Sequence, residues 1–175
     1  MPLRPPGPDD RGTERPVEQI LRALERDGRL TPAQLAQQTG RSEEEVRSLI
    51  AEAEARHVLL GYGARVNWEA LGHPEVYALV EIKVQPEENV GYSHVAGRIA
   101  RFDNVMSCYL TSGDYDLVAI VRGGSIHEVS DFVGEKLATM HGVQSTVTHV
   151  IMRRYKVDGV MLHRAGGNDR QAVVM

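Results

Sequence analysis

The sequence predicts an α+β fold in two parts, an N-terminal winged helix-turn-helix joined to a C-terminal ferredoxin-like βαββαβ domain. Up to residue 53, apolar residues recur three and four positions apart, which is the spacing of helices. From residue 76, alternating apolar runs typical of strands enclose two helical stretches, and Gly113-Asp114 between two of these runs is a hairpin signal.

The composition is that of an ordinary globular protein with no overall attraction for nucleic acid. Hydrophobic residues make up 42% and charged residues 25% of the 175 residues, and the net charge is −4. No apolar run approaches the ~18 residues of a membrane span, and the N-terminus lacks the apolar core of a secretory signal. The single cysteine, Cys108, cannot form an internal disulfide, which fits a reducing compartment. We therefore expect a cytoplasmic protein with no membrane partner.

Changes in composition along the chain predict five segments. The first of them holds four of the eight prolines and few apolar side chains, so we expect it to be disordered. The expected segments are a disordered tail (1–14), a helix-turn-helix domain (15–60), a strand linker (61–74), a βαββαβ domain (75–158) and a C-terminal tail (159–175).

Local helix signals are strongest in the first of the two domains. An apolar stripe at i, i+3, i+4 and i+7 predicts its first helix (Val17, Ile20, Leu21 and Leu24). Thr31 with Gln34, and Ser42 with Glu45, have the spacing of capping boxes, which predicts that two further helices begin at these points. Gly40 supplies the turn between them, so the last two helices form a helix-turn-helix.

The helix that follows Ser42 begins with three glutamates, each stabilised by ~0.3–1 kcal/mol at the positive end of the helix dipole. Over residues 15–60, seven arginines stand against eight acidic residues, so the intrinsic affinity for DNA phosphates should be weak. The candidate DNA contacts are Arg41, Ser42, Arg47 and Ser48, and a solvated helix face is the alternative interpretation of each.

Two short strands are expected around Gly61-Tyr62-Gly63, at residues 58–60 and 64–66. They would form the wing of a winged helix, or the start of a linker leading into the second domain.

The second domain is predicted from four strand patterns and two helix patterns. Its first strand covers residues 76–84, "NVMSCYLTS" and "DLVAIVR" are the next two, and "VQSTVTHVIMRRYK" is a long final strand. Helical spacing inserts one helix before the second strand and one after the third. Tyr77 and Leu79 occupy the face of the first strand that the helices leave open, and they are too apolar for water. We therefore infer a dimer formed by sheet-to-sheet packing.

The segment "TSGDYD" between the second and third strands is a candidate site for an amino acid. Gly113 is expected to adopt a positive φ, which can direct neighbouring amides at a carboxylate, and Asp114 or Asp116 can accept from an α-amino group. The alternative is a plain hairpin in which Asp116 bonds its own turn. The candidate ligand-binding residues are Ser112, Gly113, Asp114, Tyr115 and Asp116, with Thr146 and Thr148 of the final strand nearby.

Nothing in the sequence indicates a metal site or a catalytic group. The seven histidines are scattered without metal-ligand spacing, and no glycine-rich phosphate loop or Ser/His/Asp arrangement is evident. We therefore expect no metal, no cofactor and no enzymatic activity.

The order of these elements resembles the Lrp/AsnC (feast/famine) family of transcription regulators over about residues 16–158. "ILRALERDGRLTPAQLAQQTGRSEEEVRSLIAEAEARHVLLGYGARVN" looks like the DNA-binding half of that family. "VMSCYLTSGDYDLVAIVRG" looks like the G-x-x-D segment of its effector-binding half, with Gly113 and Asp116 in the matching positions. The resemblance implies a regulator that binds double-stranded DNA and responds to an amino acid or a related small molecule. It also implies cytoplasmic homodimers that assemble into octamers or similar rings.

Two other functions fit the same architecture. The acidic start of the third helix favours a ligand-sensing or assembly protein with weak or no DNA binding. A haem-precursor decarboxylase is the other alternative, although the sequence has no clustered His/Arg/Tyr signature.

Overall fold

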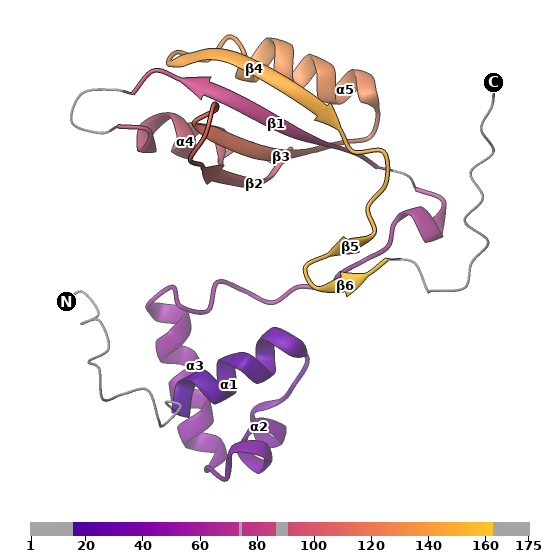
Figure 1. Ribbon diagram of the computed structural model, residues 1–175. Coiled ribbons are helices and arrows are strands. Elements are labelled where there is room, and N and C mark those ends of the chain that lie inside the picture. The colour runs from indigo at the N-terminus through magenta and orange to yellow at the C-terminus, as the bar shows by residue number, and fades with distance from the viewer. Residues whose placement is uncertain (1–15, 74, 87–90, 163–175) are drawn as a thin grey trace. The chain divides into compact units, whose positions relative to one another are not determined.

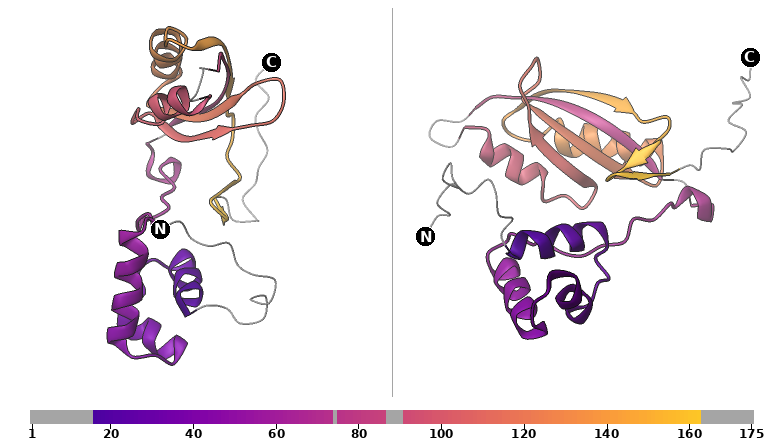
Figure 2. Two further views of the ribbon diagram at one scale, coloured as in Figure 1. Left: turned by 90° about the vertical axis from the view of Figure 1, so that its left-hand side faces the viewer. Right: turned by 60° about the horizontal axis from the view of Figure 1, so that its bottom comes forward.

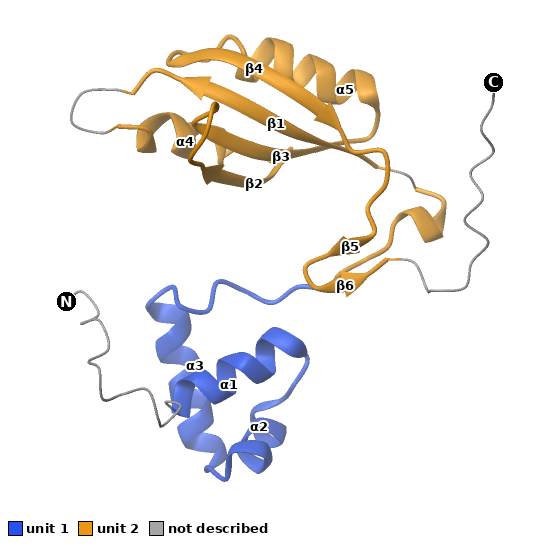
Figure 3. Ribbon diagram, in the orientation of Figure 1, with its two compact units in different colours: residues 1–64 blue, residues 65–175 orange. Residues whose placement is uncertain are grey.

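A computed structural model describes residues 16–73, 75–86 and 91–162 of the chain. It divides into two compact units, residues 1–64 and residues 65–175, which we call the helical unit and the sheet unit (Figure 3). The tail expected at residues 1–14 lies outside the described residues, as does the C-terminal tail beyond residue 162.

The helical unit contains the three predicted helices, α1 (Pro16–Arg26), α2 (Pro32–Thr39) and α3 (Glu43–Ala55) (Figure 1). Both capping boxes are formed, and Gly40 ends α2 in the left-handed conformation with φ 68°. The apolar stripes of the helices meet in one small core, whose fully buried residues are Ile20, Leu35 and Val46.

The two strands predicted around Gly61 are not formed, and residues 58–67 have no regular secondary structure. The chain reverses immediately after α3, where His57 has a φ of 53°. The Tyr62 hydroxyl donates to the Glu54 carboxylate of α3 at 2.9 Å. The segment is therefore held to the helical unit by a side chain, while Leu60 remains 87% exposed.

The sheet unit has the predicted βαββαβ order. Its elements are β1 (Val76–Val84), α4 (Ser93–Ile99), β2 (Val105–Leu110), β3 (Leu117–Gly123), α5 (Ile126–Asp131), a π-helical turn (Phe132–Leu137) and β4 (Val143–Val150). The four strands are antiparallel in the order β2-β3-β1-β4. The predicted α+β fold class is confirmed.

The final strand is shorter than predicted. The Ile151 amide makes the last bond of β4 to β1, donating to the Tyr77 carbonyl at 2.8 Å, and β1 begins at Val76. Beyond Ile151, the chain therefore has no residue of β1 left to pair with. The chain instead forms a small hairpin of β5 (Lys156–Val157) and β6 (Val160–Met161), which extends past the predicted domain boundary at residue 158.

One face of the sheet is covered by α4 and α5 (Figures 1 and 2). Alternate residues of β1 and β3 point into this core, and Val80, Ile82 and Leu117 are fully buried. Helix α5 lies so close to β3 that a Cβ on Gly123 would stand 2.9 Å from Cγ2 of Val129. The core therefore fixes α4 and α5 on one face, and no helix of the described residues covers the other face of the sheet (Figure 1).

On that open face, an arginine joins the chain after β4 to the start of the sheet unit. The Arg154 guanidinium lies 3.7 Å from the centre of the Tyr77 ring and 3.8 Å from the carboxylate of Glu69, which belongs to a 3-10 turn (Glu69–Leu71). Tyr77 in turn donates to Glu75. These contacts hold the linker against one end of β1.

Candidate functional site

The first candidate site is the N-terminal end of α3, where Ser42 is fully engaged in the helix cap. Its Oγ accepts from the Glu45 amide at 3.2 Å, and its own amide and hydroxyl both donate to the Glu45 carboxylate at 3.0 Å. Hydrogen bonds from the Ser42 backbone and then from its hydroxyl lower the pKa of Glu45. Ser42 thus holds the start of the helix and has little freedom to reach a ligand.

Arg47 and Ser48 lie on the exposed side of α3, one turn beyond Glu43 and Glu44. The Arg47 Nε donates to Oε1 of Glu43 at 3.1 Å, and Nη2 donates to the same oxygen. A second pair of the same spacing joins Arg56 to Glu52 at 2.7 Å near the end of the helix. The arginines of α3 are thus partly neutralised by their own helix.

Arg41 differs from the other candidates because it is only partly exposed. It follows the glycine turn, and its Nε is buried with no hydrogen-bond partner in the described part of the chain. The four predicted residues therefore lie within two turns at the start of α3, and Ser42, Arg47 and Ser48 are exposed.

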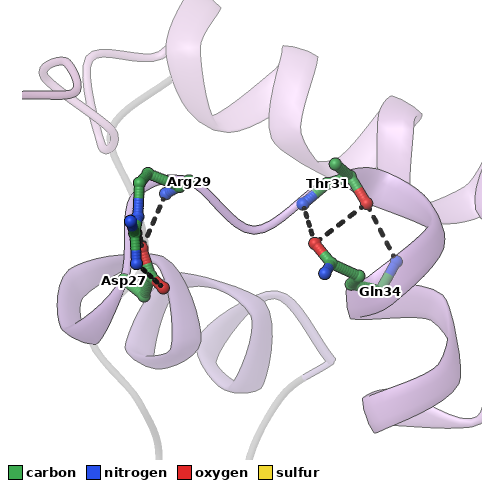
Figure 4. Close-up of polar contacts among 4 residues, drawn as sticks. All are labelled: Asp27, Arg29, Thr31 and Gln34. Carbon is green, nitrogen blue, oxygen red and sulfur yellow. Dashed lines mark hydrogen bonds and ion pairs between the residues drawn. The ribbon is translucent and has the colours of Figure 1, made fainter.

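A further ion pair, which the sequence analysis missed, lies between α1 and α2 (Figure 4). The Asp27 carboxylate accepts from Nε of Arg29 at 3.0 Å and from its Nη2 at 3.1 Å, and these bonds lower the pKa of Asp27. The adjacent capping box of Thr31 and Gln34 fixes the start of α2. Arg29 is consequently a paired arginine, and the i+2 spacing of Asp27 and Arg29 was the signal for it.

The second candidate site is the β2–β3 loop, residues 111–116. Gly113 has a φ of 145°, as predicted, and Ser112, Gly113 and Asp114 are exposed. Within the loop, the Thr111 hydroxyl donates to the Tyr115 carbonyl at 3.1 Å. The loop is therefore an ordered hairpin end with its tip open to solvent.

The Asp116 carboxylate does not bond its own turn in the described residues, which was the simpler alternative, although the Asp116 backbone carbonyl accepts from the Thr111 amide at 2.9 Å. Its carboxylate accepts from the Val84 amide of β1 at 3.0 Å, and Nζ of Lys83 lies 3.4 Å from it. The Val84 amide lowers the pKa of Asp116 most, and Lys83 and the Tyr92 hydroxyl lower it further. Lys83 also donates to the Asp114 carbonyl at 2.9 Å. The side chain of Asp116 thus anchors the loop to the end of β1.

Thr146 and Thr148 are not brought beside this loop within one chain. They pair with Ile82 and Val80 across β4 and β1, so their side chains share the helix-covered face. Since β1 lies between β4 and β3, Thr146 is about 10 Å from the strand that continues the loop. The loop and the two threonines occupy opposite sides of β1.

Within the described residues, no group of three His, Cys, Asp or Glu side chains is placed to hold a metal ion. No helix in that part of the chain is long and apolar enough to cross a membrane.

A helix-turn-helix followed in one chain by a ferredoxin-like domain defines a class of two-part, ligand-responsive DNA-binding proteins, and comparisons with known proteins agree. Residues 17–59 match the family model described as winged helix-turn-helix DNA-binding, and residues 77–161 match the Lrp/AsnC ligand binding domain. The chain belongs to the Lrp/AsnC family, as the resemblance predicted.

Its relatives match along most of their length. The chain is 39% identical over 163 residues to YugG of Bacillus subtilis, an uncharacterized HTH-type transcriptional regulator, covering 93% of this chain and 97% of that protein. It is 28% identical over 137 residues to the leucine-responsive regulatory protein of Haemophilus influenzae, covering 78% of this chain and 82% of the relative. The crystal structure of the Mycobacterium tuberculosis leucine response regulatory protein LrpA superposes with a TM-score of 0.72 at 28% identity, over 86% of this chain and all of that one.

Proposed function

We propose that this protein is a sequence-specific DNA-binding transcriptional regulator that responds to an amino acid or a related small molecule. The observation that carries the proposal is the union, in one chain of the Lrp/AsnC family, of a capped helix-turn-helix with a ligand-binding domain. Relatives named as transcriptional regulators, one of them leucine-responsive, support both halves of it. A regulator of this kind acts in the cytoplasm and needs no catalytic group.

Helix α3 is the recognition helix in this proposal. Arg47 and Ser48 reach the base edges from the major groove, while Arg41 and Ser42 contact the DNA from the turn before the helix. Because Arg47 is paired with Glu43, a single helical unit has a low affinity for DNA. A homodimer that assembles into an octamer or a similar ring compensates, because linked modules raise the effective concentration of one another.

The ligand site is the exposed tip of the β2–β3 loop. Amides near Ser112 and Gly113 suit a carboxylate, and the Asp114 carboxylate, which has no contact in the described residues, suits an ammonium group. Tyr115 and Asp116 complete this side of the site, with Asp116 holding the loop in position. Thr146 and Thr148, on the other side of β1, contribute through a neighbouring subunit.

A titration tests the DNA-binding half. The protein is mixed with its own upstream DNA, and with random DNA of equal length, at low and at moderate salt. Saturable binding that prefers the upstream DNA and weakens with salt is the expected result, and R41A/R47A should abolish it. Equal binding to both DNAs, or none, would favour the ligand-sensing protein without DNA reading, the alternative that the Arg47–Glu43 pair supports.

A thermal-shift screen with the twenty amino acids tests the other half. A ligand present at ~100 times its dissociation constant adds about 2.7 kcal/mol to the free energy of unfolding, which is easily seen as a rise in Tm. D114N should remove the shift for the amino acid that gives it. A tetrapyrrole absorbance in the purified protein would instead point to the decarboxylase.

A further inference from the structure

Helix α3 carries two ion pairs of the same kind at its two ends. Glu43 pairs with Arg47 in the first turns, and Glu52 pairs with Arg56 at the end, each across four residues. Both pairs are exposed, with 64% of the Arg47 side chain and 46% of the Arg56 side chain open to solvent. Exposed pairs of this spacing each add only about 0.3–0.5 kcal/mol to a helix, so their effect on stability is small and similar.

The two pairs differ in what they face when the helix binds DNA. In helix-turn-helix proteins the N-terminal residues of the recognition helix contact the base edges in the major groove. Of the two arginines, Arg47 lies in the first turns of α3 and Arg56 follows its last residue, so Arg47 is the one placed to read a base. Glu44, exposed beside it and without a contact in the described residues, adds a second negative charge at this point.

A carboxylate beside an arginine acts differently on its two kinds of DNA partner. Glu43 repels a phosphate and so offsets much of the attraction of Arg47 for it, and the pair gains less from the DNA backbone than a free arginine would. Guanine O6 and N7 are uncharged acceptors, and a guanidinium can donate to them in a forked geometry. Glu43 accepts from Nε and Nη2 of Arg47, which restricts the guanidinium and leaves its other N–H groups to donate.

We propose that Glu43 is a positioning residue for sequence specificity. It orients Arg47 toward a guanine edge, and it offsets the attraction of Arg47 for phosphate. Non-specific binding to DNA is therefore weakened more than binding to the specific site. This inference rests on the proposed function, and it makes the acidic start of α3 a part of DNA reading.

The test uses the full-length protein and two duplexes, one selected from a random library by the wild-type protein and one scrambled from it. Dissociation constants are measured for both duplexes between 50 and 200 mM salt. E43Q should bind the scrambled duplex about tenfold more tightly at low salt, with a salt slope steeper by about 1, because Arg47 is freed for one phosphate. The ratio of the two affinities should fall about tenfold.

The matched control is E52Q, which frees Arg56 from the same kind of pair and changes the net charge equally. It should leave the affinity ratio within twofold of wild type. In an R47A background, E43Q should no longer change the ratio, because Glu43 acts through Arg47. Glutamine keeps the shape and helix propensity of glutamate, and melting curves of each variant confirm that it is folded.

The outcomes separate this inference from the proposal beneath it. If the wild-type protein selects no duplex from the library, the regulator itself is refuted. If it selects one but E43Q leaves the ratio unchanged, or if E43Q and E52Q change it alike, the regulator stands and the role of Glu43 is overturned.

Discussion

At the scale of single residues, several charged side chains form ion pairs or hydrogen bonds within the chain. Arg29, Arg47 and Arg56 each pair with a carboxylate two or four positions away, and Asp116 bonds the end of β1. The first three pairs could be read from their spacing in the sequence. The partners of Asp116 could not, because they lie 32 and 33 residues away and meet only once the strands are paired.

Asp116 should stabilise the fold in a pH-dependent way. D116N keeps the shape but removes the charge that accepts from Val84 and Lys83, and we expect it to lower the free energy of unfolding by about 1–2 kcal/mol at pH 7. The pKa of Asp116 is lowered in the folded state, so its contribution is complete above the usual pKa of the carboxyl and is lost as the pH falls through the lowered one.

Urea unfolding of both proteins at pH 7 and below pH 4 measures the effect, and the difference between D116N and wild type should shrink at the acid end. D114N is the matched control, since the Asp114 carboxylate is exposed and should not alter stability. If the free energy of unfolding of D116N stayed below that of wild type by the same amount at both pH values, the charge of Asp116 would not be the source of its contribution.

At the scale of elements, local signals predicted how helices begin but not where strands end. The capping boxes at Thr31 and Ser42 act within three residues, so sequence alone placed α2 and α3. The end of β4 depends on where β1 starts, and the segment expected to form the wing has no strands but contacts α3 through the Tyr62–Glu54 hydrogen bond. Both are set by tertiary structure, to which local strand propensity is secondary.

Two glycines in the sheet unit should respond oppositely to the same substitution. G123A introduces a Cβ 2.9 Å from Val129, which must push α5 off β3, and we expect a loss of about 1–3 kcal/mol in the free energy of unfolding. G97A lies in α4 with nothing within 4 Å of the new Cβ, and should gain about 0.5–1 kcal/mol from helix propensity.

Chemical denaturation of the two variants beside wild type measures both changes. An unchanged or raised free energy of unfolding for G123A would mean that α5 moves away from β3 without cost, contrary to the close approach at Gly123.

At the scale of the whole molecule, the sheet unit is complete on one face only. Leu79 of β1 and Ile120 of β3 pair with each other on the open face, and both are half-buried in the single chain. Their neighbours along each strand point to the other face, which the helices cover. The sequence alone predicted this asymmetry, because both phases of the β1 alternation contain apolar residues. The sheet-to-sheet dimer inferred from these apolar residues stays a prediction, since a single chain does not show what its open face packs against.

A second copy packed sheet to sheet is the partner that we expect, and L79E tests it. A glutamate at this position would place a charge in the middle of the interface, which is costly without a partner, so the dimer should dissociate. Light scattering should give the wild-type protein a mass of at least twice its 19.4 kDa subunit, and L79E a mass near one subunit.

The DNA affinity of L79E should fall by about a hundredfold or more, because each helical unit then binds alone. V58E is the control: Val58 is 48% exposed on the helical unit, so a charge there should alter neither the mass nor the fold. An L79E protein that is folded, keeps the wild-type mass and binds DNA as tightly would show that the open face is not where the subunits meet. The DNA affinity of the protein would then need another explanation than dimer avidity, because the paired arginines of α3 give a single helical unit only a low affinity.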